Sequence, residues 1–174
     1  MRRFFRFLSD ESASQIAEAA LVLPLAFMML LGIYWFGRAF NVYATINHAA
    51  REGARAAVAQ TCATCTNLPP SALAVANIVK QALQASNVDP SQIQQYPLTP
   101  PATCGGVAEV CDFSNNNITV CTNAPLTPAS PNPYPQVCGV SVSFQYPYQM
   151  SLPFTSLNQQ QFLLKANVQM KGEY

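Results

Sequence analysis

A single carboxylate, Glu18, lies at the entrance of a long uncharged segment, where its charge could bind a cationic group. The nineteen residues between Glu18 and Arg38 carry no formal charge. As an α-helix with a rise of about 1.5 Å per residue, they would span roughly the 30 Å of a bilayer's hydrocarbon core. The pattern predicts one membrane-spanning helix with an acidic residue at its start.

Six cysteines form the second reactive set, and all of them follow the predicted span: Cys62, Cys65, Cys104, Cys111, Cys121 and Cys138. This placement indicates an oxidising compartment and structural disulfides, although the sequence leaves the pairing open. Cys62 and Cys65 have the C-x-x-C spacing of thiol oxidoreductases. They lack the strand-before and helix-after setting of that fold, so the sequence favours a structural disulfide.

Other chemistries find little support in the composition. Cys104/Cys111 and Cys121/Cys138 are spaced too widely for a zinc finger, so we expect no metal site. His48 is the only histidine, and we expect it on a helix surface. Nine Lys plus Arg residues against eight Asp plus Glu residues give no basic patch for nucleic acid. We therefore expect a protein that is not an enzyme and needs no cofactor.

The residues around the span predict its orientation. Basic residues precede it, and aromatic residues lie near its far end: Arg2, Arg3, Arg6, Tyr34, Trp35 and Phe36. Lys/Arg bias then places the N-terminus in the cytoplasm and everything after about Phe40 outside. Bulky residues continue where a secretory signal would have a small-residue cleavage site, which favours a retained anchor. About 130 outer residues predict one small domain.

Helical character continues beyond the span. Residues 41 to 60 contain no proline and are rich in alanine, so one helix of about 45 residues, roughly 65 to 70 Å long, is expected. Arg51, Glu52 and Arg55 are expected on its solvated flank. A stripe of mostly small side chains would let another element approach closely: Ile46, Ala49, Ala50, Gly53, Ala54 and Ala57.

The rest of the chain predicts a second helix and a small sheet. Ser71 is the expected N-cap of a helix that runs to about Ser86, with an apolar face of Leu73, Ala76, Val79 and Leu83. Period-two alternation predicts strands at 140–148 and 162–171, with a shorter candidate at 117–121. Pro147 suggests that the first long strand is an edge strand or bends. Residues 97–135 are rich in proline and are expected to be irregular.

Residues 13–59 resemble the N-terminal signature of the TadE-like family, which are pilin-like minor subunits of tight-adherence (Flp-type) pilus systems. The similarity rests on Glu18, "ALVLP" at 20–24, "FGR" at 36–38 and "AAREGAR" at 49–55; Arg38, Arg51, Glu52 and Arg55 belong to these motifs. The resemblance implies a pilin-like α+β fold: a long N-terminal transmembrane helix that continues into an outer domain with a second helix and a small antiparallel sheet.

The resemblance also implies a processing step and an assembly role. A prepilin peptidase would cut between Ala13 and Ser14, where Ala13 replaces the usual glycine. Glu18 would then offset the new α-amino group of a neighbouring subunit, a buried pairing that can also set register. Pro24 could let the helix kink during packing. Gly53, at the centre of the small-residue stripe, would serve helix packing.

We therefore expect four regions: a basic cytoplasmic leader at 1–13, a transmembrane helix at 14–40, its outer extension at 41–61, and a disulfide-bonded α+β domain at 62–174. The expected function is that of a minor pilin or pseudopilin-like subunit in the bacterial inner membrane, which serves the assembly, initiation or anchoring of a tight-adherence type pilus or a type II-like secretion apparatus. It would pack against other pilin subunits and meet the assembly platform. Two alternatives remain: a membrane-tethered adhesion module with a passive anchor, and a periplasmic thiol oxidoreductase that uses Cys62 and Cys65.

Overall fold

The computed structural model describes residues 11–59, 70–97, 102–112, 117–126, 137–149 and 161–171, with side chains from residue 15 onward. The chain divides into two compact units, Met1–Phe40 and Asn41–Tyr174, which we call unit 1 and unit 2. Each unit is described by itself. The basic leader at 1–10 and the pair Cys62 and Cys65 lie outside the described residues.

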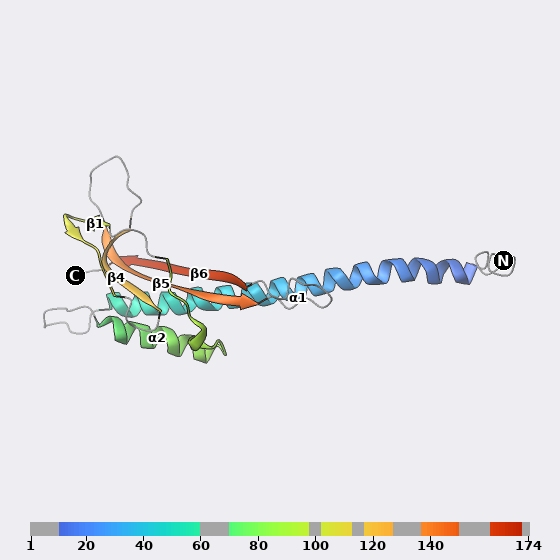
Figure 1. Cartoon of the computed structure of the whole chain (residues 1–174), viewed down its shortest axis with the longest axis horizontal. Helices are drawn as coiled ribbons and strands as arrows, with labels where there is room; N and C mark the ends of the chain where they lie inside the picture. Colours follow the sequence, from blue (N-terminus) through green and yellow to red (C-terminus); the bar gives the residue numbers. More distant parts are fainter. Residues whose placement is uncertain are drawn as a thin grey trace. The chain divides into compact units, whose positions relative to one another are not determined.

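The expected long N-terminal helix is confirmed. Helix α1 runs from Glu11 to Val58 without interruption and passes through Pro24 (Figure 1). Alanine, leucine and methionine are strong helix formers, which explains why the chain stays helical on both sides of the proline. Pro24 itself has no N–H, so the carbonyl of Ala20 loses its intrahelical partner.

In unit 2, helix α2 packs beside the last part of α1. Helix α2 spans Ala72–Ala85 and begins after the predicted N-cap, Ser71, whose hydroxyl oxygen accepts a hydrogen bond from the Ala74 N–H at 3.3 Å. A short 3-10 turn, η2, follows at Pro90–Gln92. It is capped by Asp89, whose pKa is lowered because its carboxylate accepts hydrogen bonds from the Ser91 backbone N–H and hydroxyl.

The predicted apolar face of α2 is wrong at one residue. Leu73 is 53% exposed, whereas Val75 is fully buried together with Ala76, Val79 and Leu83. With 3.6 residues per turn, Leu73 lies about 120° around the helix from Val79, while Val75 lies only about 40° from it. The buried face is therefore centred on Val79, and Leu73 falls outside it.

Unit 2 also contains the predicted antiparallel sheet. Its four strands are β3 (Val110–Asp112), β4 (Thr119–Pro125), β5 (Cys138–Gln149) and β6 (Gln161–Lys171), in the order β3-β4-β5-β6. A separate hairpin joins β1 (Thr103–Cys104) to β2 (Val107–Ala108). The short candidate strand at 117–121 corresponds to β4. The expectation of an irregular segment at 97–135 is wrong for β1, β2 and β3, which also lie within it.

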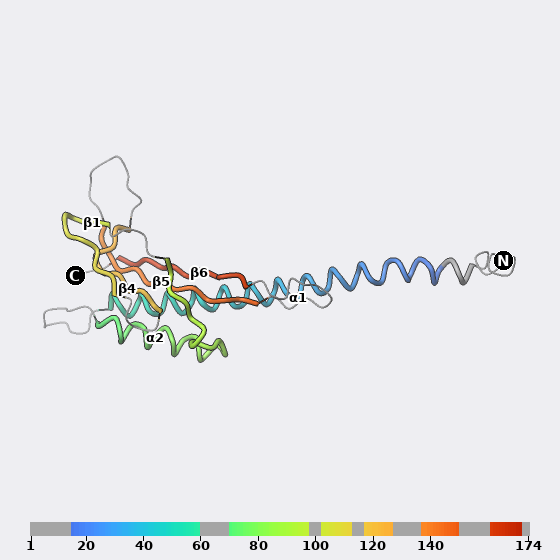
Figure 2. Tube along the Cα trace, viewed as in Figure 1, coloured from blue at the N-terminus to red at the C-terminus, as the bar shows by residue number. Residues whose placement is uncertain are grey.

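The small-residue stripe of α1 forms one side of the core. Every one of its six members is buried: Ile46, Ala49, Ala50, Gly53, Ala54 and Ala57. They pack with alternate residues of β5, of which Val140, Val142 and Phe144 are fully buried. Figure 2 shows β5 and β6 alongside the part of α1 that belongs to unit 2. Helix and sheet thus cover each other's apolar faces.

Pro147 lies in a strand that is central over only part of its length. Strand β5 pairs with β6 throughout, but its pairing with β4 ends at Ser143, and one further bridge joins Gln145 to Gln94. The Gln145 N–H donates to the Gln94 carbonyl. The backbone nitrogen of Pro147, two residues further along, points to the same edge of the strand. No described segment pairs there, so the missing N–H of Pro147 costs no ladder hydrogen bond.

Candidate functional site

The apolar part of α1 in unit 1 is uncovered. Every side chain from Gln15 to Leu30 is exposed, including Glu18. Many of them are large and apolar: Leu21, Val22, Leu23, Leu25, Phe27, Met28, Met29 and Leu30 are each at least 57% exposed. A helix that is apolar on all sides needs a lipid or protein environment, because water would leave this surface unfavourably hydrated.

Among the described helices, α1 is the one long and apolar enough to cross a membrane, and its most apolar window is not buried. This fits a single-pass membrane anchor. Glu18 then lies near one end of the apolar segment and Arg38 near the other, with no formal charge between them. Glu18 is the only acidic group of this stretch, and its side chain is exposed.

An aromatic and cationic cluster lies at the second end of the apolar segment. The rings of Tyr34 and Trp35 meet edge to face with centroids 5.4 Å apart. The Arg38 guanidinium lies 5.8 Å from the centre of the Trp35 ring. Such a cation–π pair beside tyrosine is typical of the membrane–water interface, where amphipathic rings and basic groups are favourable. The aromatic run was expected here, but the Trp35–Arg38 contact was not.

Gly53 lies in the core of unit 2 and faces α2. A Cβ atom at this position would overlap Val79 Cγ2 and would lie 3.6 Å from Val75 Cγ1 and 3.7 Å from Val142 Cγ1. Because valine side chains are stiff, the helices can approach this closely only with glycine here. By contrast, a Cβ atom added at Gly32 or Gly37 would meet no atom within 4 Å beyond the adjacent helix backbone. The close approach at Gly53 is thus made within the chain.

The polar residues beside Gly53 lie toward the surface. Arg51 and Arg55 are exposed, Glu52 is half-buried, and His48 is exposed. Their positions suit a solvated helix flank, as the sequence predicted. Packing explains why charged residues and Gly53 occur together in the motif at 49–55. The small residues face inward, and the charged residues occupy the outward positions of the helix.

Two disulfides stabilise the described part of unit 2. Cys104 is joined to Cys138, which connects the β1–β2 hairpin to the start of β5. Cys111 is joined to Cys121, which lies directly opposite it in the pairing of β3 with β4. The general expectation of disulfides is confirmed for these four cysteines, and the structure provides the pairing that the sequence left open.

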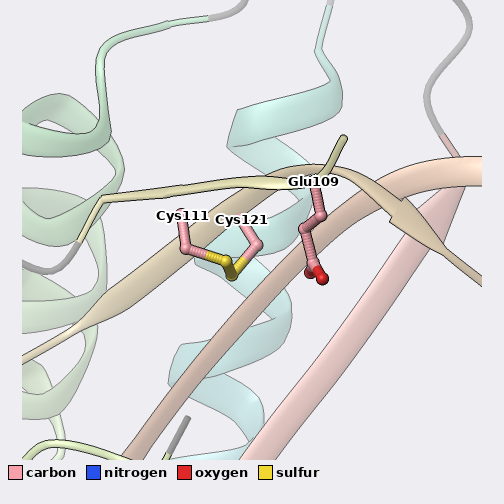
Figure 3. A group of neighbouring side chains, drawn as sticks. All are labelled: Glu109, Cys111 and Cys121. Carbon is pink, nitrogen blue, oxygen red and sulfur yellow. A yellow bond between two sulfur atoms is a disulfide. The ribbon is translucent and has the colours of Figure 1, made fainter. Parts of the chain in front are cut away.

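Glu109 lies beside the second disulfide (Figure 3). Its carboxylate and the two sulfur atoms lie within 4.8 Å of one another, a grouping that resembles a metal site. Metals bind cysteine as the thiolate, however, and both sulfurs are held in the disulfide. Glu109 instead accepts a hydrogen bond from the Ala102 N–H at 3.2 Å, so its role in the described structure is to hold the strand leading into β1.

The β1–β2 hairpin is another feature that sequence patterns missed. Its turn, Gly105–Gly106, has positive φ at both residues, which glycine adopts without strain. The Asn123 side-chain amide donates to the carbonyls of Cys104 at 3.1 Å and Val107 at 2.8 Å. Asn123 has positive φ at an irregularity in β4, between Thr122 and Ala124. The adjacent glycines were the one local signal for this turn.

Two open cavities in unit 2 are lined by both polar and apolar groups. One, of about 370 Å³, is lined by Lys80, Pro90, Ser91, Ile93 and Asn117. The other, of about 150 Å³, lies over the sheet face that carries Ser141 and Ser143 and is bounded by Tyr96 and Glu109.

Ala13 and Ser14 belong to the first turn of α1, where the backbone is helical and the side chains lie outside the described part. Comparison with known proteins addresses this region directly. A family model described as "TadE-like protein" matches residues 13–55, a segment that contains Ala13, Ser14, Glu18, Pro24 and Gly53. Neither the curated proteins nor the solved structures gave a match.

The matched segment includes the uncovered apolar helix and the first part of the helix that packs in unit 2. This family suggests an association with tight-adherence pilus components, and a structural rather than a catalytic role. Over residues 13–55, the chain is therefore similar to the TadE-like family.

Proposed function

We propose that this protein is a structural minor pilin or pseudopilin-like subunit, which serves the assembly, initiation or anchoring of a tight-adherence type pilus. The observation that carries the proposal is that the family match covers an apolar helix whose side chains are exposed. In lipid this surface forms a single-pass anchor. In an assembled pilus, the same surface packs against the helices of neighbouring subunits.

The proposed topology follows from charge and aromatic placement. The Arg2, Arg3 and Arg6 leader lies in the cytoplasm of a bacterial cell, and unit 2 lies on the outer side of the inner membrane. The disulfides of unit 2 suit that oxidising side. The partners are other pilin subunits, a prepilin peptidase and the pilus assembly platform. The protein itself is not an enzyme in this proposal.

Glu18 is the main assembly residue. A cut between Ala13 and Ser14 creates an α-amino group that is largely cationic at neutral pH. Buried in a bundle of apolar helices, that charge needs a counter-charge, because an isolated buried ion is very unfavourable. Glu18 is the single acidic residue of the uncovered segment and provides it from a neighbouring copy. Pro24 allows local adjustment of the helix. Gly53 has a different role, since it orders unit 2 internally.

The N-terminal sequence and the mass of the mature chain test the processing step. We expect the protein isolated from its native membrane to begin at Ser14, because the peptidase pocket admits a small residue such as Ala13 before the cut. Replacing Ala13 with a bulky residue, Ala13→Leu, is expected to leave the chain starting at Met1. A wild-type chain that retains Met1 would contradict processing and would favour a permanent tether.

A further inference from the structure

Two exposed apolar side chains lie at the start of β6, outside the core. Phe162 is 49% exposed and Leu163 is 45% exposed. Neighbouring residues of a strand point to opposite faces of the sheet, so both faces are apolar at this end. Further along β6, the outward positions are polar: Lys165, Asn167 and Gln169 are all exposed. The alternation of β6 is therefore broken at the end where the strand begins.

The cross-strand partners extend this apolar end into β5. Phe162 lies opposite Tyr148, and Leu163 lies opposite Pro147. Residues 150 to 160 connect the two strands and lie outside the described residues. In the sequence, no formally charged residue occurs between Asp112 and Lys165. The described end of the β5–β6 pair thus presents aromatic, aliphatic and proline side chains without a charge of its own.

The register between β5 and α1 shows which end of unit 2 this is. A Cβ on Gly53 would lie 3.7 Å from Val142 Cγ1, so these two residues are level with each other. Strand β5 runs antiparallel to α1 (Figure 1). The six residue steps from Val142 to Tyr148 cover about 20 Å of strand. The same distance corresponds to about 13 residues of helix, which reach back from Gly53 to about the start of unit 2 at Asn41.

Phe162 is therefore level with the start of unit 2 at Asn41. Two observations agree with this placement. Val42 and Leu164 pack against the same core, and Tyr43, on the same end of the unit, is 46% exposed. Asn41 directly follows Phe40, the last residue of unit 1, so this is the end of unit 2 that the chain joins to the apolar helix.

We propose that Phe162 and Leu163 insert into the headgroup region of the bilayer that holds α1, so that the start of β6 is a second membrane contact. A lipid surface fits because the side chains are apolar, the nearest charge along β6 is the cationic Lys165, and this end of unit 2 follows the span directly in the chain. Such side chains enter the interface by about 5 to 10 Å. The contact rests on the proposed anchorage and adds to it a second point at which the chain touches the bilayer.

Tryptophan fluorescence can test this, because Trp35 is the only tryptophan in the chain. The full chain would be reconstituted into vesicles of phosphatidylcholine and phosphatidylglycerol that contain nitroxide-labelled lipid, with the nitroxide at the headgroup or high on the acyl chain. A Trp35→Phe, Phe162→Trp variant reports on the start of β6. A Trp35→Phe, Val110→Trp variant is the control, since Val110 is 64% exposed and pairs on β3 with Thr122, level with Val140 and away from this end.

We expect strong quenching and a blue shift of emission for the parent Trp35 and for the Phe162→Trp variant, but neither change for the Val110→Trp variant. If Trp35 is quenched and the Phe162→Trp reporter is not, the second contact is wrong while the anchorage stands. Equal quenching of the Val110→Trp reporter would also overturn it, since the contact would then not be specific to this end. If Trp35 is unquenched, the anchorage fails, and this inference fails with it.

Discussion

Replacing Glu18 with alanine is expected to reduce incorporation of the protein into pili or their assembly base by about 100-fold or more. Removing one partner of a buried ion pair costs about 3 to 5 kcal/mol, and every 1.4 kcal/mol is tenfold in an equilibrium. In the proposed assembly, the substitution leaves the Ser14 α-amino group of a neighbouring subunit without a counter-charge. The amount of protein in the membrane should stay unchanged, because Glu18 is exposed and has no role in the core.

Glu18→Gln and Glu52→Ala are the matched comparisons. The amide of glutamine keeps the size of the side chain but not its charge, so Glu18→Gln should lose nearly as much incorporation as Glu18→Ala. Glu52 is a carboxylate on the same helix, but it lies on the half-buried flank in unit 2, and its loss should leave incorporation near the parent level. For each of the three variants, the ratio of assembled to membrane-bound protein measures incorporation. Normal incorporation of Glu18→Ala would contradict the pairing.

Removing the Cys104–Cys138 disulfide is expected to lower the free energy of unfolding of unit 2 by about 4 kcal/mol in the chain-entropy account, because it closes a loop of 34 residues. This is a large share of the 5 to 15 kcal/mol that is typical of a folded protein. Cys104 is also buried, at 1% exposure, so the loss of its sulfur leaves a small void. The variant is Cys104→Ala with Cys138→Ala, which leaves no unpaired partner.

The second disulfide provides the internal control. Cys111–Cys121 closes only 10 residues, and the ladder between β3 and β4 already holds its two ends together. Its double alanine variant should therefore lose less, about 3 kcal/mol. Denaturant unfolding of the full chain in detergent, followed by circular dichroism, measures both. An equal loss in the two variants, or a greater loss for Cys111–Cys121, would contradict this account of unit 2.

The regular elements of the fold were predictable because their residues repeat with a clear period. The uncharged run after Glu18 and the alanine-rich continuation defined α1, Ser71 defined the start of α2, and period two defined β5 and β6. Leu73 was misassigned because the face of a short helix depends on where its centre lies. The surface against which the helix packs sets that centre, and the helix's own sequence does not specify this surface.

The short strands could not be predicted in this way. Strands β1, β2 and β3 have two or three residues each, too few to show a period. They are ordered by distant groups: the Cys104–Cys138 disulfide, the Asn123 amide and the pairing of Cys111 with Cys121. Such contacts join residues far apart in the chain, and single-sequence patterns hold no information about them.

The candidate site was only partly visible from the sequence. Glu18 and Arg38 mark the two ends of the span as plain charges in an apolar run. Gly53 predicted a close approach, but its partner, Val79 of α2, became clear only from the packing. Phe162 and Leu163 read as ordinary strand residues. Their exposure follows from the end of the core near Leu164, a property of the assembled sheet.

The central claim is that the apolar helix of unit 1 assembles by specific packing and is more than a tether. Replacing residues 19–33 with a leucine–alanine membrane helix of equal length tests it most directly, since Ala13, Ser14, Glu18 and Trp35 remain in place. We expect the chimera to reach the membrane with unit 2 folded and both described disulfides formed, yet to fail to support pilus assembly. Assembly at the parent level would contradict the claim and would favour a membrane-tethered binding module with a passive anchor.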